Sequence, residues 1–212
     1  MKNNSLDVFP PGSIIGIMGG GQLGRMTALA AANLGYRCHI YTEETDSPAA
    51  QVSATTTVAS YKDHDALTQF AKSVDLITYE FENIPMSSIT LLNNIRSIRP
   101  SPSILAISQH RGKEKEFAVQ HGVNVAPYKI IKNISDLESA IKTIGTPSVL
   151  KTSRFGYDGK GQIVINEPAE IHSAWNQLSS DDLVLEQFIA FEKEISIIIA
   201  RDTNHKTKAY QA

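Results

Sequence analysis

Cysteine is nearly absent from this chain of 212 residues, in which Cys38 is the single one. One cysteine builds neither a disulfide framework within the chain nor a cysteine metal cluster, and it fits a reducing compartment. The six histidines lack a His-x-x-x-His or similar spacing, so we predict no metal site. No serine stands in a Gly-x-Ser-x-Gly elbow, which argues against a hydrolase triad.

An excess of one charge and long apolar runs are also absent. Lysine and arginine number 20 and aspartate and glutamate 22, so the formal net charge is -2. This balance gives no electrostatic reason to expect nucleic acid or a membrane surface as a partner. No apolar run is long enough to span a bilayer, and residues 1–12 lack the features of a secretory signal. We therefore predict a cytoplasmic protein of one large or two small domains.

Apolar runs and helical patterns alternate along residues 13–93. Short connections between them predict an α/β fold with a parallel sheet that carries helices on both faces. The first helix presents Leu23, Met26, Leu29 and Ala30 on one face, and Gly35 stands where it should stop. Strands are expected at 13–18, 38–41, 55–58 and 74–79, and helices at 22–34, 63–73 and 86–93.

Prolines around Arg99-Pro100-Ser101-Pro102 break helix and strand alike, so a domain boundary is expected there. Beyond it, Ser135 with Glu138 resembles a capping box that opens a helix. The chain ends inside an expected strand, so we expect it to be part of a longer protein. Helices are predicted at 112–121, 136–144 and 168–178, strands at 128–131, 148–152, 162–165, 183–186, 192–201 and 206–212, and a hairpin turn at 202–205.

The most informative segment is the glycine loop, residues 154–162, with the sequence RFGYDGKGQ. It follows an apolar run that ends in Lys151 and precedes a second β-like run. Three glycines let the backbone approach phosphate oxygens, and Arg154, Lys160 and Lys151 supply cations for a polyphosphate. It differs from the GxxxxGK[ST] phosphate loop, because no serine or threonine follows Lys160. The alternative is an ordinary hairpin with a glycine-rich turn.

A second glycine cluster, Gly19-x-Gly21-x-x-Gly24, stands between a strand and a helix. This is the context of a dinucleotide-binding loop, with Glu43 or Glu44 near the place of a ribose-binding acid. By motif alone, NAD(P) binding ranks first. The alternatives are binding of another phosphate, such as that of a nucleotide-like substrate, and tight strand–helix packing without a ligand.

Three further segments carry groups suited to ligand binding. The sequence YEFENIP at 79–85 follows a buried strand. Its acidic side chains could bind hydroxyl groups of a ligand, or they could simply cap a helix. The segment LEQFI at 185–189 could bind the edge of an adenine ring through its backbone groups, and Glu194 could then accept hydrogen bonds from ribose hydroxyls. The alternative is an ordinary sheet edge. The run QHRGKEK at 109–115 is a solvated charged face or an anion site, and Arg111 at a helix N-terminus favours an anion there.

Taken together and in this order, four motifs resemble one family. They are GGGQLGRM at 19–26, YEFEN at 79–83, FGYDGKGQ at 155–162 and EQF at 186–188. The chain resembles 5-(carboxyamino)imidazole ribonucleotide synthase, an ATP-grasp enzyme of purine synthesis, from residue 13 onward. The resemblance implies a Rossmann-like pre-ATP-grasp domain at 13–102 after an extension at 1–12. Linker helices at 103–122, an α+β lid subdomain of the ATP-grasp fold at 123–190, and the start of a C-terminal subdomain at 191–212 would follow.

The same resemblance implies the site residues. Lys151 and Lys160 would be catalytic, and the glycine turn of the first domain would face the substrate rather than NAD. ATP would be bound by Arg111, Lys151, Gly156, Tyr157, Asp158, Gly159, Lys160, Gly161, Gln162, Glu186, Gln187, Phe188, Ile189 and Glu194. The ribonucleotide would be bound by Gly20, Gly21, Gln22, Leu23, Glu80, Tyr157, Asp158 and Lys160.

The implied reaction carboxylates 5-aminoimidazole ribonucleotide with bicarbonate and ATP, through carboxyphosphate. Its cofactors would be ATP and Mg²⁺, with the magnesium ligands supplied by a further stretch that this chain lacks, so we expect no turnover by the chain alone. A homodimer is expected for the longer protein. The alternatives are another ATP-grasp purine ligase, a nucleotide-binding module without catalysis, and an NAD(P)-dependent oxidoreductase that uses residues 19–24.

Overall fold

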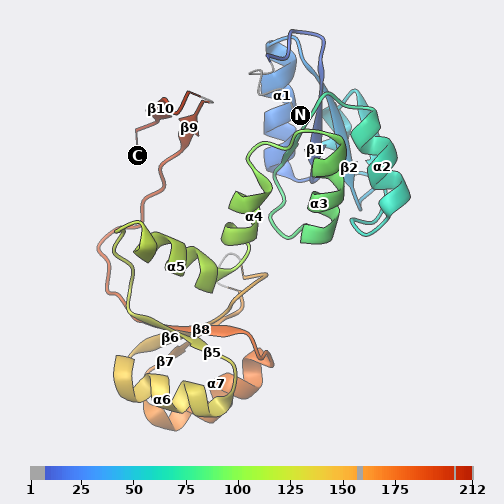
Figure 1. Cartoon of the computed structure of the whole chain (residues 1–212). Coiled ribbons are helices and arrows are strands. Elements are labelled where there is room, and N and C mark those ends of the chain that lie inside the picture. The colour runs from blue at the N-terminus through green and yellow to red at the C-terminus, as the bar shows by residue number, and fades with distance from the viewer. Residues whose placement is uncertain (1–7, 157–159, 203, 212) are drawn as a thin grey trace.

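The computed structural model describes residues 8–156, 160–202 and 204–211. Two sheets with their own helices form two halves, and α4 (Pro102–Ser108) and α5 (Arg111–Gln120) lie between them (Figure 1). The α/β class predicted from the alternation of elements is confirmed. Pro102, expected to mark a break, is the first residue of α4, where a missing backbone N–H costs nothing.

The first half is a parallel sheet in the order β3-β2-β1-β4. Its strands are β1 (Ile14–Met18), β2 (Arg37–Thr42), β3 (Thr55–Val58) and β4 (Leu76–Tyr79). The connections are α1 (Gln22–Asn33), the short turn η1 (Ala50–Val52), α2 (His64–Lys72) and α3 (Met86–Ile95). All carboxyl ends of these strands lie at one edge, so the loops after β1 and β4 meet there.

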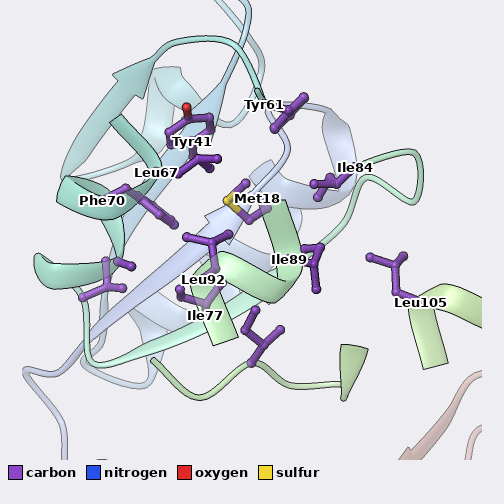
Figure 2. Packing of buried hydrophobic residues seen from close by; sticks show 13 residues of the cluster. Met18, Tyr41, Tyr61, Leu67, Phe70, Ile77, Ile84, Ile89, Leu92 and Leu105 are labelled. Carbon is purple, nitrogen blue, oxygen red and sulfur yellow. The ribbon is translucent and has the colours of Figure 1, made fainter. Parts of the chain in front are cut away.

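Both faces of this sheet are covered, as the apolar strands predict. On one face α2 and α3 bury Phe70, Leu67 and Leu92 against Met18 and Tyr41 (Figure 2). On the other face α1 packs Ala28 and Ala31 against the strands. Small side chains let a helix lie close to a sheet. The apolar area that these side chains bury stabilises the fold by about 25 cal/mol per Å².

The predicted inward face of α1 is wrong. Leu23, Met26 and Leu29 are exposed, and the buried positions are Gly24, Ala28 and Ala31. The helix packs through its small residues because the backbone of the glycine turn brings it close to the strands. The stop at Gly35 is confirmed, since this residue follows the C-cap with a φ of 83°.

The second half is an antiparallel sheet in the order β5-β8-β6-β7. Figure 1 shows α6 and α7 on one face of this sheet and α5 over the other. The strands are β5 (Tyr128–Ile131), β6 (Ser148–Thr152), β7 (Gln162–Ile165) and β8 (Leu183–Gln187). The helices are α6 (Ile134–Ile144), the short turn η2 (Pro168–Glu170) and α7 (Ile171–Leu178).

The predicted cap of α6 is wrong by two residues. Asn133, not Ser135, is the N-cap, and its side chain accepts a hydrogen bond from the Asp136 amide at 2.9 Å. The Asp136 carboxylate in turn accepts from the Lys132 amide at 3.0 Å. Two reciprocal bonds of this kind satisfy backbone donors that the helix itself leaves open, so Asn133 fixes the start of α6.

The last expected strands are shorter than the sequence indicates. Residues 192–198 form no strand, and β9 (Ile199–Arg201) pairs with β10 (Thr207–Ala209) in an antiparallel ladder. The hairpin turn between them includes residue 203, which lies outside the described residues. In Figure 1 this hairpin lies apart from both sheets. The apolar side chains of residues 195–199 are exposed, so the strand pattern there has no partner surface within the described chain.

Candidate functional site: an acidic cavity and a cation cluster at the glycine loop

The glycine turn after β1 is held by an acid from the end of β4. Gly19 has a φ of 120°, which only glycine adopts readily, and its amide bonds to the carbonyl of Tyr41 at 2.9 Å. The Gly21 amide, at the N-cap of α1, donates to Glu80 Oε1 at 2.7 Å. The positive end of the α1 dipole is therefore compensated by a carboxylate of the protein itself.

A cavity of about 300 Å³ opens beside this turn. Glu43 accepts from the Ser60 hydroxyl and the Tyr61 amide, both at 2.9 Å, so one of its carboxylate oxygens is fixed at the rim. The Tyr61 ring stacks on Phe81 with centroids 5.6 Å apart. Burial, together with Glu43 and Glu80, raises the pKa of the Tyr61 hydroxyl, which stays protonated at neutral pH. The cavity is lined by Gly20, Gly21, Thr42, Glu43, Glu44, Tyr61, Glu80 and Phe81.

This lining favours hydroxyl, amine or ring groups over phosphate. Three carboxylates face the cavity, and the Gly21 amide is already bonded to one of them. Carboxylates accept from hydroxyl and amino donors, whereas they repel an anion at short range. The predicted substrate residues Gly20, Gly21 and Glu80 come together here. Gln22 and Leu23 are exposed on α1 and do not line the cavity.

A second site lies on the α5 face of the antiparallel sheet. Lys151 Nζ lies 3.1 Å from Glu186 Oε2, and Lys115 Nζ lies 3.2 Å from the same oxygen. All three side chains are largely buried, with exposed fractions of 21%, 10% and 16% for Lys151, Glu186 and Lys115. Two ammonium groups thus share one carboxylate, and the carboxyl group of Glu114 also interacts with Lys115 and Arg111.

The register of the sheet explains how Lys151 and Glu186 meet. Val149 pairs with Glu186, and Lys151, two residues along β6, points to the same face. Leu150 and Leu185 point to the opposite face and enter the core under α6 and α7. One alternation therefore buries the leucines and gathers the charged groups on the α5 side.

Arg111 begins α5 and holds both ends of the segment that enters the glycine loop. Its Nε donates to the Thr152 carbonyl at 3.1 Å, and its Nη2 donates to the Gly156 carbonyl at 3.0 Å. Its backbone amide donates to the Ser153 carbonyl at 2.9 Å. The predicted helix starts one residue late, because Arg111 is the first residue of α5 and His110 is its N-cap.

His110 anchors this helix start to Asp182, the residue before β8. Its Nδ1 accepts from the Gly112 amide at 3.1 Å, and its Nε2 lies 3.2 Å from Asp182 Oδ2. Lys132 Nζ donates to Asp182 Oδ1 at 2.7 Å. Partial burial acts to raise the pKa of Asp182, but the hydrogen bond from Lys132 and the nearby His110 outweigh it, so this pKa is lowered. These contacts fix the N-terminus of α5 and therefore the position of the Arg111 backbone.

The hinge segment, residues 188–191 after β8, leaves backbone amides open to a ligand. The Gln187 amide donates to the Pro127 carbonyl at 2.9 Å and the Phe188 amide to the Pro147 carbonyl at 3.2 Å. Among the described residues the Ile189 amide has no hydrogen-bond partner. Phe188 and Ile189 are about half exposed and offer apolar surface beside that donor.

The other predicted residues divide into three groups. Gly161 and Gln162 close the glycine loop, with the Gly161 carbonyl bonded to the Thr152 amide at 2.8 Å, and Lys160 precedes them. Tyr157, Asp158 and Gly159 lie outside the described residues. Glu194 is exposed in the segment before β9 and makes no hydrogen bond or ion pair within the described chain. Each assigned role therefore stays a prediction.

Sequence reasoning missed Lys115, which it left in a solvated charged run. The signal was its spacing, because residue 115 stands four positions after Arg111 and shares its face of the helix. Gln109, which also lay in that run, is 5% exposed and contacts both halves of the chain.

The described residues contain no cluster of protein ligands that would hold a metal ion by itself. No group of three or more histidine, cysteine, aspartate or glutamate side chains there could hold a metal ion. None of the helices in the described ranges is long and apolar enough to cross a membrane.

Comparison with known families agrees with both halves. Residues 13–109 match the ribonucleotide synthetase pre-ATP-grasp domain, and residues 116–212 match the ATP-grasp domain. The fold and these two domain matches thus define a protein of the ATP-grasp class.

Comparison with individual known proteins shows which members of this class the chain is similar to. The chain is 38% identical over 206 residues to N5-carboxyaminoimidazole ribonucleotide synthase of Bacillus subtilis, covering 97% of the chain and 54% of that protein. It is 43% identical over 194 residues to the enzyme of the same name from Brucella melitensis, covering 91% and 54%. The structure of N5-carboxyaminoimidazole synthetase from Staphylococcus aureus complexed with ADP has a TM-score of 0.92 at 33% identity, covering 98% and 56%.

The chain belongs to the N5-carboxyaminoimidazole ribonucleotide synthase family of ATP-grasp proteins. It spans about half the length of these relatives, with residues that match their pre-ATP-grasp domain and part of the ATP-grasp domain.

Proposed function

We propose that the protein represented by this chain carboxylates 5-aminoimidazole ribonucleotide with bicarbonate and ATP in purine synthesis. The observation that carries the proposal is the gathering of Lys151 and Lys115 on the Glu186 carboxylate, beside Arg111 at the entry to the glycine loop. Ammonium groups that share one largely buried carboxylate can turn to an anion, and a nucleotide phosphate supplies one. Relatives have been solved with ADP or ATP bound.

In this proposal ATP lies between the hinge and the cation cluster. The Ile189 amide donates to the adenine ring, which Phe188 flanks with apolar surface. Lys151 leaves Glu186 for a phosphate oxygen, and Lys115 keeps the Glu186 carboxylate compensated. Arg111 holds the backbone of the glycine loop near the phosphates. These contacts neutralise charge on the transferring phosphoryl group, which is the main catalytic task in such reactions.

The ribonucleotide lies at the acidic cavity, with its donors toward Glu80 and the rim carboxylates. A bicarbonate oxygen attacks the γ-phosphorus of ATP, and ADP leaves, which gives carboxyphosphate. The amine of the ribonucleotide then attacks the carboxyl carbon, the C–O bond to phosphate breaks, and the amine loses a proton. A relative from Aspergillus clavatus has been solved with ADP and 5-aminoimidazole ribonucleotide bound.

Titration calorimetry with ADP tests this function. We expect the chain to bind ADP and the Lys151→Met variant to bind it about 10- to 100-fold more weakly, the range for a lost charged hydrogen bond of about 1.5–3 kcal/mol. Lys142→Met, at an exposed position of α6, is the control and should bind like the unaltered chain. Equal ADP affinity in the Lys151 and Lys142 variants would contradict the assigned phosphate role.

The dimer and the cytoplasmic location stay part of the proposal. A purine-synthesis enzyme uses ATP and bicarbonate, which are both available in the cytoplasm. Sedimentation of the longer protein at several concentrations would decide between monomer and dimer.

A further inference from the structure

Gln109 is a buried amide that touches both halves of the chain. It caps the end of α4 and is 5% exposed. Its Nε2 donates to the carbonyls of Glu82 at 2.6 Å and Ile84 at 2.7 Å. Its Oε1 accepts from Arg154 Nη1 at 3.2 Å.

Its partners come from the two ligand-facing edges. Glu82 and Ile84 belong to the loop that follows β4 and Glu80, so they adjoin the acidic cavity. Arg154 opens the glycine loop. A polar cavity of about 240 Å³ lies at this junction, lined by Glu82, Ser108, Gln109, Arg111, Glu114, Ser153, Arg154, Phe155 and Gly156.

The bonding of this amide is complete. A primary amide has two N–H donors, and both are used on backbone carbonyls, while its oxygen takes the guanidinium. A shift of either loop would leave a polar group of this amide without a partner. Such a shift is costly, because the amide is buried. The position of the β4 loop and that of Arg154 are therefore linked through one side chain.

We propose that Gln109 is a positioning residue that couples the two ligand sites. It holds Arg154 and the start of the glycine loop against the loop after β4, so a ligand at the acidic cavity changes the affinity of the nucleotide site, and the reverse. The identity of the two coupled ligands rests on the proposed function. The positioning of Arg154 by Gln109 does not, because the hydrogen bond between them exists in the ligand-free chain.

The first test needs no ligand and measures trypsin cleavage after Arg154. In Gln109→Met, which keeps the length of the side chain and removes its hydrogen bonds, we expect cleavage there to be at least fivefold faster. Cleavage after Arg201, in the exposed β9 strand, should be unchanged. Gln120→Met, at an exposed position of α5, is the matched control. An unchanged rate after Arg154 overturns the proposal, and equal acceleration at both sites shows general unfolding and overturns it too.

The second test measures the ADP dissociation constant with and without saturating 5-aminoimidazole ribonucleotide. In the unaltered protein the ribonucleotide should change it at least fivefold, a usual size for coupling between two sites. In Gln109→Met the change should shrink to within twofold, while each ligand alone still binds. Gln109→Glu keeps an acceptor for Arg154 and loses both donors, so it should protect Arg154 from trypsin and still lose the coupling.

The outcomes separate the two claims. Coupling of equal size in Gln109→Met and the unaltered protein, or none in the unaltered protein, overturns the coupling role. Absence of ADP binding to the unaltered protein counts against the proposed function instead, and the trypsin result still decides whether Gln109 positions Arg154.

Discussion

Glu80 Oε1 accepts a hydrogen bond from the Gly21 amide at 2.7 Å, so an acid from the end of β4 closes the N-terminus of α1. In a dinucleotide-binding loop this helix end receives the pyrophosphate of the cofactor. Here the same amide has a carboxylate partner, and two further acids line the cavity beside it. The glycine pattern is thus shared with dinucleotide-binding proteins, while the electrostatics of the turn differ.

NAD should therefore not bind at this turn. We expect calorimetric titration of the chain with NAD to give no binding heat, because the pyrophosphate would have to displace Glu80 and approach two other carboxylates. Titration with ADP under the same conditions is the control, because it shows that the protein sample is folded and able to bind a nucleotide. Binding of NAD without binding of ADP would overturn the ATP-grasp function and restore the oxidoreductase alternative.

Gly19 should be intolerant of a side chain. A Cβ at this position meets the side chain of Glu80, and the φ of 120° lies in a region that other residues avoid. We expect Gly19→Ala to lower the free energy of unfolding by more than about 2 kcal/mol, since strain and contact add. Gly122→Ala is the matched control, because its φ of 73° is also positive but nothing lies within 4 Å of the added atom. Urea unfolding of both variants measures the difference, and equal losses would contradict the role of the contact.

Lys115 should support nucleotide binding without touching the nucleotide. When Lys115→Met removes one of the two ammonium groups on Glu186, Lys151 has to compensate that buried carboxylate alone. It is then less available to a phosphate, so ADP affinity should fall about 3- to 10-fold, roughly 1 kcal/mol. Lys115→Arg should retain most of the affinity, and Lys113→Met, on the exposed part of α5, should retain all of it. A Lys115→Met variant with unchanged affinity would show that Lys151 does not need this support.

Asp182 should contribute stability that depends on pH. The pKa of this carboxyl is lowered in the folded chain from its usual 3.8, so its ion pairs stabilise the fold above pH 3.8. That stabilisation is lost as pH falls through the folded pKa, when the carboxylate takes up a proton. The difference in unfolding free energy between the unaltered chain and Asp182→Asn, measured by urea unfolding, should thus be present at neutral pH and shrink below about pH 4. Asp181→Asn, at an exposed neighbouring position, is the control for the loss of one negative charge.

The 212-residue chain should not hydrolyse ATP by itself. Magnesium is normally held by protein carboxylates together with substrate phosphates, and the described residues present no cluster suited to it. Phosphate release measured with ATP, magnesium, bicarbonate and the ribonucleotide should match the rate without protein. Turnover above that background, removed by Lys151→Met, would show that this chain holds a complete catalytic site.

Much of the site follows from local patterns. The period of two in β6 and β8 places Leu150 and Leu185 in the core, and it therefore puts Lys151 and Glu186 on the opposite face. Glycines 19–24 between a strand and a helix predict a ligand-facing turn, and the acids at 79–83 follow a parallel strand, which brings both segments to one edge. These features depend on neighbours in sequence, so the sequence is sufficient to indicate them.

Other features depend on contacts between distant segments. The inward face of α1 was mispredicted because closeness to the sheet, rather than hydrophobicity, selects Gly24, Ala28 and Ala31. The strand expected at 192–201 is shorter in the structure, because a β pattern forms a strand only where a partner strand is present.

What the sequence alone determined is the order of elements, the glycine loop and the family resemblance, since these are written in residue types and spacing. The tertiary structure decided which charges compensate one another. Lys115 meets Glu186, Glu80 meets Gly21 and Gln109 meets Arg154 only after chain segments far apart in sequence fold together. The energy of a buried charge or amide depends on its partners within a few ångströms, and folding, not spacing, brings those partners together.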